Sequence, residues 1–90
     1  MKTIWKYELR SKVTKLLLHE EAEVLSVAVQ NQSIMMWVRQ DFSRAQENRT
    51  FCRLNTGEPH DYDLLRFIGT VHLEDGTIVV HVFEMGGLDG

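Results

Sequence analysis

Apolar and aromatic residues alternate with charged ones at the start of the chain, which is the pattern of a strand with one buried face. Trp5, Tyr7 and Leu9 occupy alternate positions, and charged residues lie between them. Successive side chains of a strand point to opposite faces of the sheet. We therefore expect a half-buried strand from Thr3 to Leu9.

Two further strands are expected around a turn in the first half of the chain. The segment Val24 to Gln30 is rich in β-branched residues, and Ile34 to Arg39 is apolar on both faces, with Trp37 as its largest member. The residues between them, Asn31-Gln32-Ser33, suit a tight turn because Asn tolerates the left-handed conformation. This hairpin is expected to form the centre of the sheet.

A second hairpin is expected near the end of the chain. Glu74-Asp75-Gly76 separates two alternating runs, Arg66 to Leu73 and Thr77 to Glu84. An Asp-Gly pair between two such runs is a strong short-range signal for a hairpin.

The middle of the chain carries weaker signals. Asp41 to Asn48 is polar without a clear period and predicts a loop, whereas Thr50 to Leu54 predicts a short strand. Asn55-Thr56-Gly57-Glu58-Pro59 is dense in turn residues and should end that strand. His60 to Leu65 is expected to be a polar connection that includes at most one helical turn.

The segment Val13 to Val24 fits two structures. Val13, Leu16 and Leu17 recur at helical spacing and Ser11 could cap a helix. The run Leu16-Leu17-Leu18 also has the length of a buried strand, and periodicity alone does not separate the two.

Five to six short strands with tight turns predict an all-β or mostly β fold, as a small antiparallel sheet that is rolled into a barrel or folded as a sandwich. The 90 residues leave room for one domain. We expect this domain over residues 1–85 and a flexible tail over 86–90, where glycines collect.

Charge and cysteine content restrict the class of function. The net charge of −3 argues against general nucleic-acid binding, which needs a surplus of cations on the protein. A single cysteine, Cys52, allows no internal disulfide and predicts a reducing, cytoplasmic setting. No apolar run approaches the roughly 18 residues that cross a bilayer, so no membrane association is expected.

Several segments together resemble a known family. They are Lys2-Thr3-Ile4-Trp5-Lys6-Tyr7-Glu8-Leu9, Val24-Leu25-Ser26-Val27, Thr56-Gly57-Glu58-Pro59, Phe67-Ile68-Gly69-Thr70 and Val80-His81-Val82-Phe83-Glu84. In this order they are similar to small uncharacterised proteins found mainly in bacteriophages and prophages. The resemblance implies action in the cytoplasm of a bacterial host, but no mechanism. Where this chain has His19-Glu20-Glu21-Ala22, the similar proteins carry a Pro-x-Gly-Ala turn, which implies a strand over residues 13–18 although this chain lacks the Pro and the Gly.

No group of residues predicts catalysis, a bound metal or a cofactor. The four histidines are scattered, although His72 and His81 could face each other across the second hairpin. The cluster His60-Asp61-Tyr62-Asp63 holds the most titratable groups, so His60, Asp61 and Asp63 are kept as a polar-loop candidate, with a hydrolase as the function it would imply. Cys52 lies inside a predicted strand and is expected to be buried and unreactive. We therefore expect a protein that is not an enzyme.

The leading hypothesis is a binding protein that acts on a host or phage macromolecule, with counter-defence as one role that the phage resemblance suggests. The aromatic residues Trp5, Tyr7, Trp37, Phe51, Phe67 and Phe83 are most simply core, but Trp and Tyr are also enriched at binding hot spots. We choose Trp37, Met35, Arg39, Arg49 and Arg53 as candidate partner-binding residues, and expect a protein partner or self-association. The alternative is an oligomer that sequesters a small anionic, nucleotide-like ligand through Arg39, Arg44, Arg49 and Arg53.

Overall fold

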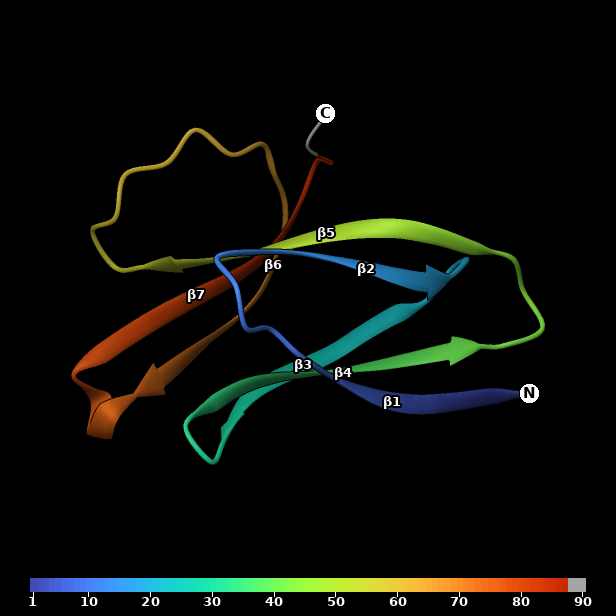
Figure 1. The fold of residues 1–90 in the computed structure, drawn as a ribbon, viewed down its shortest axis with the longest axis horizontal. Coiled ribbons are helices and arrows are strands. Elements are labelled where there is room, and N and C mark those ends of the chain that lie inside the picture. The colour runs from blue at the N-terminus through green and yellow to red at the C-terminus, as the bar shows by residue number, and fades with distance from the viewer. Residues whose placement is uncertain (88–90) are drawn as a thin grey trace.

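The computed structural model of the chain describes residues 1–87 and consists of seven β-strands and one 3₁₀ turn (Figure 1). The elements are β1 (Lys2–Glu8), β2 (Val13–His19), β3 (Glu23–Gln30), β4 (Ser33–Asp41), β5 (Gln46–Asn55), β6 (Leu64–Leu73), η1 (Glu74–Gly76) and β7 (Ile78–Met85). The all-β prediction is confirmed, and β2 and the longer β5 account for most of the additional strand residues.

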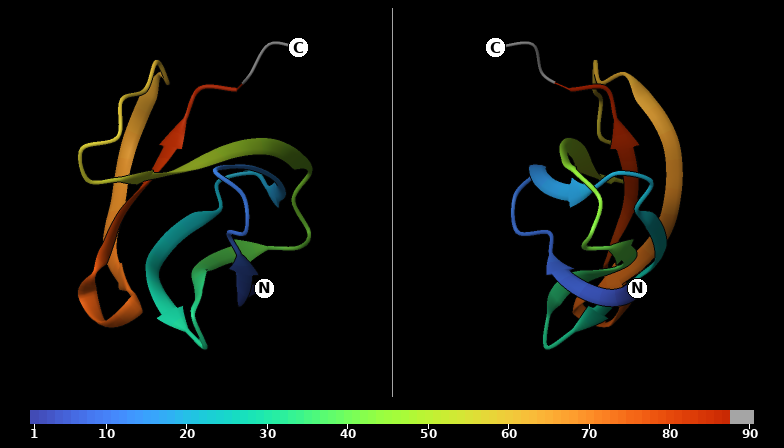
Figure 2. Two further views of the ribbon diagram at one scale, coloured as in Figure 1. Left: turned by 60° about the vertical axis from the view of Figure 1, so that its left-hand side comes forward. Right: turned by 90° about the vertical axis from the view of Figure 1, so that its right-hand side faces the viewer.

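The strands form two antiparallel sheets. The first has the order β1-β4-β3 and the second has the order β2-β5-β7-β6. The edge strands β3 and β6 run close together, so that one sheet follows the other around a shared interior (Figure 2). The sheets do not close into a barrel, which corrects one of the two arrangements that the sequence predicts.

The core fills the space that the two sheets enclose. Its most buried side chains come from both sheets: Leu9, Leu18, Ala22, Val24, Ile34, Met36, Val38, Phe51, Val71, Val80 and Val82. In β4 the alternation is strict, since Ile34, Met36 and Val38 are buried and the residues between them reach the surface. Transfer of this apolar surface from water is the main source of stability for so small a domain.

The turns follow the backbone preferences of their residues. Asn31 and Gln32 both have positive φ, 51° and 66°, as the two-residue turn between β3 and β4 requires. Between β6 and β7, Asp75 has φ 55° and Gly76 has φ 87°. Both predicted hairpins are confirmed.

The segment from Val13 to Val24 is a strand followed by a turn, not a helix. β2 ends at His19, and Glu21 adopts a positive φ of 64° in the turn before β3. The strand implied by the resemblance is therefore correct. Glu21 has the positive φ that a glycine would adopt with less strain.

The structure corrects three other predictions. β5 begins at Gln46, so the predicted loop 41–48 shrinks to residues 42–45, and β6 begins at Leu64, so the predicted connection 60–65 shrinks to residues 60–63. Of the aromatic residues expected in the core, Phe51 is buried, whereas Trp5 is 52% exposed and Phe67 is 57% exposed. Both exposed residues lie on strands at a sheet edge. Residues 88–90 of the predicted tail lie outside the described residues.

Candidate interaction surfaces

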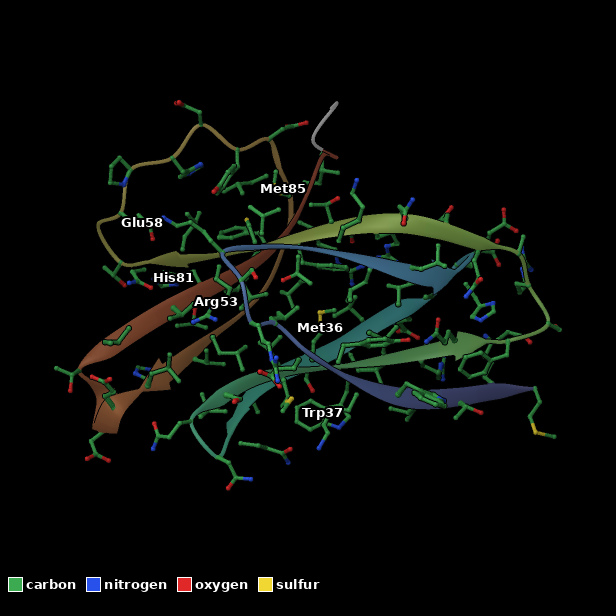
Figure 3. All side chains as sticks on the ribbon, in the orientation of Figure 1. Met36, Trp37, Arg53, Glu58, His81 and Met85 are labelled. Carbon is green, nitrogen blue, oxygen red and sulfur yellow. The ribbon has the colours of Figure 1, made fainter. Side chains whose placement is uncertain are left out.

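The outer face of the β1-β4-β3 sheet brings together three of the five predicted partner-binding residues. Met35, Trp37 and Arg39 alternate with the buried residues of β4, so their side chains point away from the core. Trp37 stands in the middle strand (Figure 3) and is paired with Lys6 of β1 and Ser26 of β3. We call this surface the Trp37 face.

The Trp37 face is apolar at its centre and carries both signs of charge. Exposed apolar side chains flank Trp37 on each side, since Ile4 on β1 is 54% exposed and Leu25, at the bulge of β3, is 43% exposed. Arg39 forms an ion pair with Glu23 across the strands, at 2.8 Å between Nη2 and Oε1. The Lys6 ammonium donates to Oε1 of Gln30 on β3 at 3.0 Å. This hydrogen bond crosses β4 and links the two outer strands of the sheet.

Arg49 does not reach the Trp37 face. Its Nε and Nη2 each donate to one carboxylate oxygen of Glu84 at 2.7 Å, and its Nη1 donates to the carbonyl of Ala22 at 2.6 Å. The two side chains are 14% and 15% exposed. The hydrogen bonds to Glu84 raise the pKa of Arg49 above its usual value. Arg49 therefore links β5 and β7 to the turn before β3, and its donors are already engaged.

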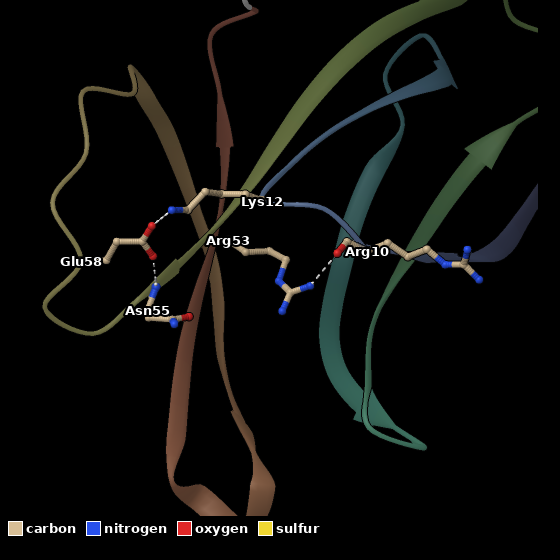
Figure 4. A pocket seen from close by; sticks show the side chains of 5 residues that line it. All are labelled: Arg10, Lys12, Arg53, Asn55 and Glu58. Atoms are coloured by element: carbon tan, nitrogen blue, oxygen red, sulfur yellow. Dashed lines mark hydrogen bonds and ion pairs between the residues drawn. The ribbon is translucent and has the colours of Figure 1, made fainter.

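Arg53 lines a cationic cavity of about 390 Å³ (Figure 4). Arg53 lies on β5, in the other sheet from Arg39 of β4. The lining residues are Arg10, Lys12, Arg53, Asn55 and Glu58. The Nη1 of Arg53 donates to the carbonyls of Leu9 and Arg10 at 2.9 and 3.1 Å. Lys12 and Arg53 thus bring two cations to the cavity against one lining carboxylate, which is paired with Lys12. The Arg10 guanidinium points away from them (Figure 4) and contacts Glu8.

Arg39 and Arg44 belong to a different and smaller cavity, of about 170 Å³. Four carboxylates line it with them: Glu20, Glu21, Glu23 and Asp41. Arg44 contacts Glu21 at 3.2 Å. The four arginines proposed to hold an anionic ligand therefore do not converge, and only Arg53 lies in a cavity with a cationic lining.

The polar loop does not assemble a catalytic group. His60 and Asp61 are exposed, and the Nδ1 of His60 accepts a hydrogen bond from the backbone N–H of Tyr62 at 3.1 Å. The His60 ring stacks on the Tyr62 ring at 5.8 Å between centroids. Asp63 accepts from the N–H of Gly86 through its backbone carbonyl at 2.9 Å, which fixes the end of the loop.

The remaining titratable candidates also have structural partners. His81 lies between the hydroxyls of Thr56 and Thr70, at 2.7 and 2.9 Å, and is paired with Thr70, not with His72. Burial raises the pKa of the Cys52 thiol above 9.0. Within residues 1–87 no three His, Cys, Asp or Glu side chains gather in a way that could hold a metal ion. No helix in the same range has the length and apolar character of a membrane span.

Sequence reasoning missed an aromatic group beside β1. Trp5 makes an edge-to-face contact with Phe42, with 5.6 Å between the ring centroids. Phe42 makes a second such contact with His19, with 4.7 Å between the centroids. Phe42 stands alone in a polar stretch, so periodicity offered no signal for it. Periodicity also gave no signal for Arg10 and Lys12 of the cationic cavity, because they lie in the short connection between β1 and β2.

The model of a family described as "Domain of unknown function (DUF7352)" matches residues 1–88. No curated protein and no solved structure gives a significant match.

Proposed function

We propose that this chain, which belongs to the DUF7352 family of domains of unknown function, is a non-catalytic binding protein that holds a protein partner on the Trp37 face. One observation carries the proposal. A Trp side chain stands at the middle of a sheet face, with exposed Ile4 and Leu25 on the two neighbouring strands. Aromatic residues at the centre of a patch with a polar rim are typical of protein-binding hot spots.

The charges on the Trp37 face favour a protein over a nucleic acid as the partner. Arg39 is paired with Glu23, and Lys6 is followed along its strand by Glu8 on the same face. A phosphate backbone needs uncompensated cations to replace its counterions. The net charge of −3 adds to this argument. The resemblance to phage and prophage proteins supports a partner from the bacterial host or the phage, in the cytoplasm, and counter-defence is the role we propose on that basis.

The test compares two aromatic residues on different sheets, Trp37, which is half-buried, and Phe67, which is exposed. The full-length protein is purified from a bacterial host as Trp37→Ser, as Phe67→Ser and unchanged, and the chains that copurify in stoichiometric amounts are quantified. Phe67 is the matched control because it is exposed on β6, in the second sheet. Loss of one partner chain with Trp37→Ser but not with Phe67→Ser is expected. Equal retention by folded Trp37→Ser would overturn the proposal.

The cationic cavity supports a second candidate, the binding of a small anionic ligand. Lys12 and Arg53 bring their cationic groups to it, and guanidinium groups are well suited to phosphate or carboxylate. A ligand that binds only the folded chain at about 100 times its dissociation constant stabilises it by about 2.7 kcal/mol. A thermal-shift panel of nucleotides should raise the unfolding midpoint of the unchanged protein and of Arg44→Ala, but not of Arg53→Ala. No shift with any anion would exclude this candidate.

A further inference from the structure

β1 has one free backbone edge. Among the strands that the structure describes it pairs with β4 only, and all five residues from Lys2 to Lys6 are exposed. The N–H of Leu9 donates to the carbonyl of Ile34 at 2.9 Å, in the same register as the rest of the β1–β4 pair. Hydrogen-bonded pairs alternate in an antiparallel ladder, so the odd-numbered residues of β1 bond to β4.

The even-numbered residues of β1 therefore point their backbone groups away from the sheet. These residues are Lys2, Ile4, Lys6 and Glu8. Within residues 1–87 no other strand pairs with this edge. Such a row of unpaired N–H and C=O groups is a template for another strand.

We infer that β1 pairs antiparallel with β1 of a second copy of this chain, about a two-fold axis that passes through Trp5. The pairing joins two three-stranded sheets into one continuous sheet of both copies. It goes beyond the proposed function, because it uses the free backbone edge of β1, although the side chains of its even-numbered residues lie on the Trp37 face. An isologous contact of this kind requires that the strand be complementary to itself.

The charges of β1 favour this register over its two neighbours. With the axis at Trp5, Lys2 faces Glu8 of the second copy, and Ile4 faces Lys6. All of these residues have even numbers, so their backbone N–H and C=O groups point to the free edge. Each pair can therefore form the backbone hydrogen bonds of the new ladder. Moving the axis to Ile4 would place Lys2 against Lys6, and moving it to Lys6 would place Lys6 against itself. Like charges directly opposite each other are destabilising.

The inner side of the strand also fits the pairing. Trp5 meets Trp5 of the second copy at a position where no backbone bonds form and side chains approach most closely. It is 52% exposed in the single chain and makes an edge-to-face contact with Phe42. Burial of this surface would add apolar and aromatic contact to the backbone bonds.

Lysines on an edge strand commonly prevent pairing, but the two in β1 do not oppose this one. Lys2 gains an opposite charge, and the ammonium of Lys6 lies over the sheet at Gln30, away from the free edge. Glu8 contacts Arg10 at 2.8 Å in a pair whose arginine is 81% exposed. That ion pair is open to water, so Glu8 can exchange Arg10 for Lys2 of the second copy at little cost in free energy.

Charge exchange tests the register directly. Sedimentation of the full-length chain should show a reversible dimer, and Lys2→Glu or Glu8→Lys should each weaken it about tenfold, since each change acts at two symmetric contacts. The double variant Lys2→Glu with Glu8→Lys should restore the dimer, which a general loss of folding would not do. A monomer at all concentrations would overturn the inference, and so would a dimer that neither single change weakens. Loss of the partner chain with Trp37→Ser is read separately, so the two proposals can fail independently.

A cross-link gives a second measurement. In a Cys52→Ala background, Trp5→Cys should oxidise to a disulfide-linked dimer, because residues facing each other at such a site have Cα atoms within disulfide reach. Phe67→Cys is the control, since Phe67 is equally exposed but lies on β6. Cross-linking of Trp5→Cys no faster than that of Phe67→Cys would contradict the register.

Discussion

Gly69 of β6 lies so close to Val27 of β3 that a Cβ atom on the glycine would come within 2.8 Å of the valine Cγ2. This is the place where the edges of the two sheets run side by side. The register of β6 against β7 shifts between Phe67 and Gly69, and the bulge lets the strand bend towards β3. The close approach of these two residues therefore holds the two sheets around one core.

Gly69→Ala should destabilise the protein by about 1–3 kcal/mol, because the added methyl must displace a β-branched side chain in a packed site. The free energy of unfolding is measured by denaturant titration. The matched variant is Val27→Ala, which removes the atom that the new methyl would meet. In that background Gly69→Ala should cost less than it does alone, and equal costs in both backgrounds would show that the contact does not matter.

The Arg49–Glu84 ion pair should matter far more to stability than Arg39–Glu23. The first pair is 14% and 15% exposed and bidentate, whereas the second is 46% and 51% exposed. Removal of one member of a buried pair leaves the other charge without its partner. We expect Arg49→Met to cost about 3 kcal/mol and Arg39→Met less than about 1 kcal/mol. Similar costs for the two would contradict the structural role that we give Arg49.

The local chemistry of turns made much of the fold predictable. Asn31, Asp75 and Gly76 adopt the positive φ that their hairpins need, and that preference is visible in the sequence. The start of β5 was not visible, because Gln46, Glu47 and Asn48 form no pattern. They are in a strand because β2 supplies their backbone partners, at His19, Leu18 and Leu17. Pairing between segments so far apart leaves no local signal.

The candidate sites were predictable only in part, for a similar reason. The alternation along β4 placed Met35, Trp37 and Arg39 on one face without knowledge of the fold. Arg49 looked like a free cation until the topology brought Glu84 beside it, 35 positions away in the sequence. Trp5 lies in the strand that its pattern predicts, but β1 is at the edge of its sheet, so half of its side chain remains exposed.

Tyr7→Phe should destabilise the protein through Gln40. The side chain of Gln40 is 2% exposed, its Nε2 donates to the Tyr7 hydroxyl at 2.7 Å, and its Oε1 accepts from the backbone N–H of His19 at 3.0 Å. Without the hydroxyl, a buried donor loses its acceptor, which costs about 1–3 kcal/mol. Tyr62→Phe, on the partly exposed loop, should change the unfolding free energy by less than about 0.5 kcal/mol. A neutral Tyr7→Phe would mean that Gln40 finds another acceptor.

Cys52 should resist alkylation as long as the protein is folded. The residue is 1% exposed, and burial raises the pKa of its thiol above the usual value, which makes the reactive thiolate scarcer. Labelling with a maleimide or iodoacetamide, followed by mass spectrometry, should show a rate that rises with denaturant in step with unfolding. Rapid labelling in the absence of denaturant would contradict the position of Cys52 in β5.

Asp41 should give the protein an acid-dependent loss of stability. Its carboxylate accepts hydrogen bonds from the hydroxyl and the backbone N–H of Ser43, at 2.7 and 3.0 Å, and these bonds lower its pKa from 3.8 to about 2. Because the folded pKa is the lower one, the stabilisation is fully present above pH 4 and is lost as the pH falls from about 4 to about 2. Asp41→Asn removes the titration. The difference in unfolding midpoint between the unchanged protein and Asp41→Asn should therefore shrink over that pH range, and a difference that stays constant would show that Asp41 does not titrate with folding.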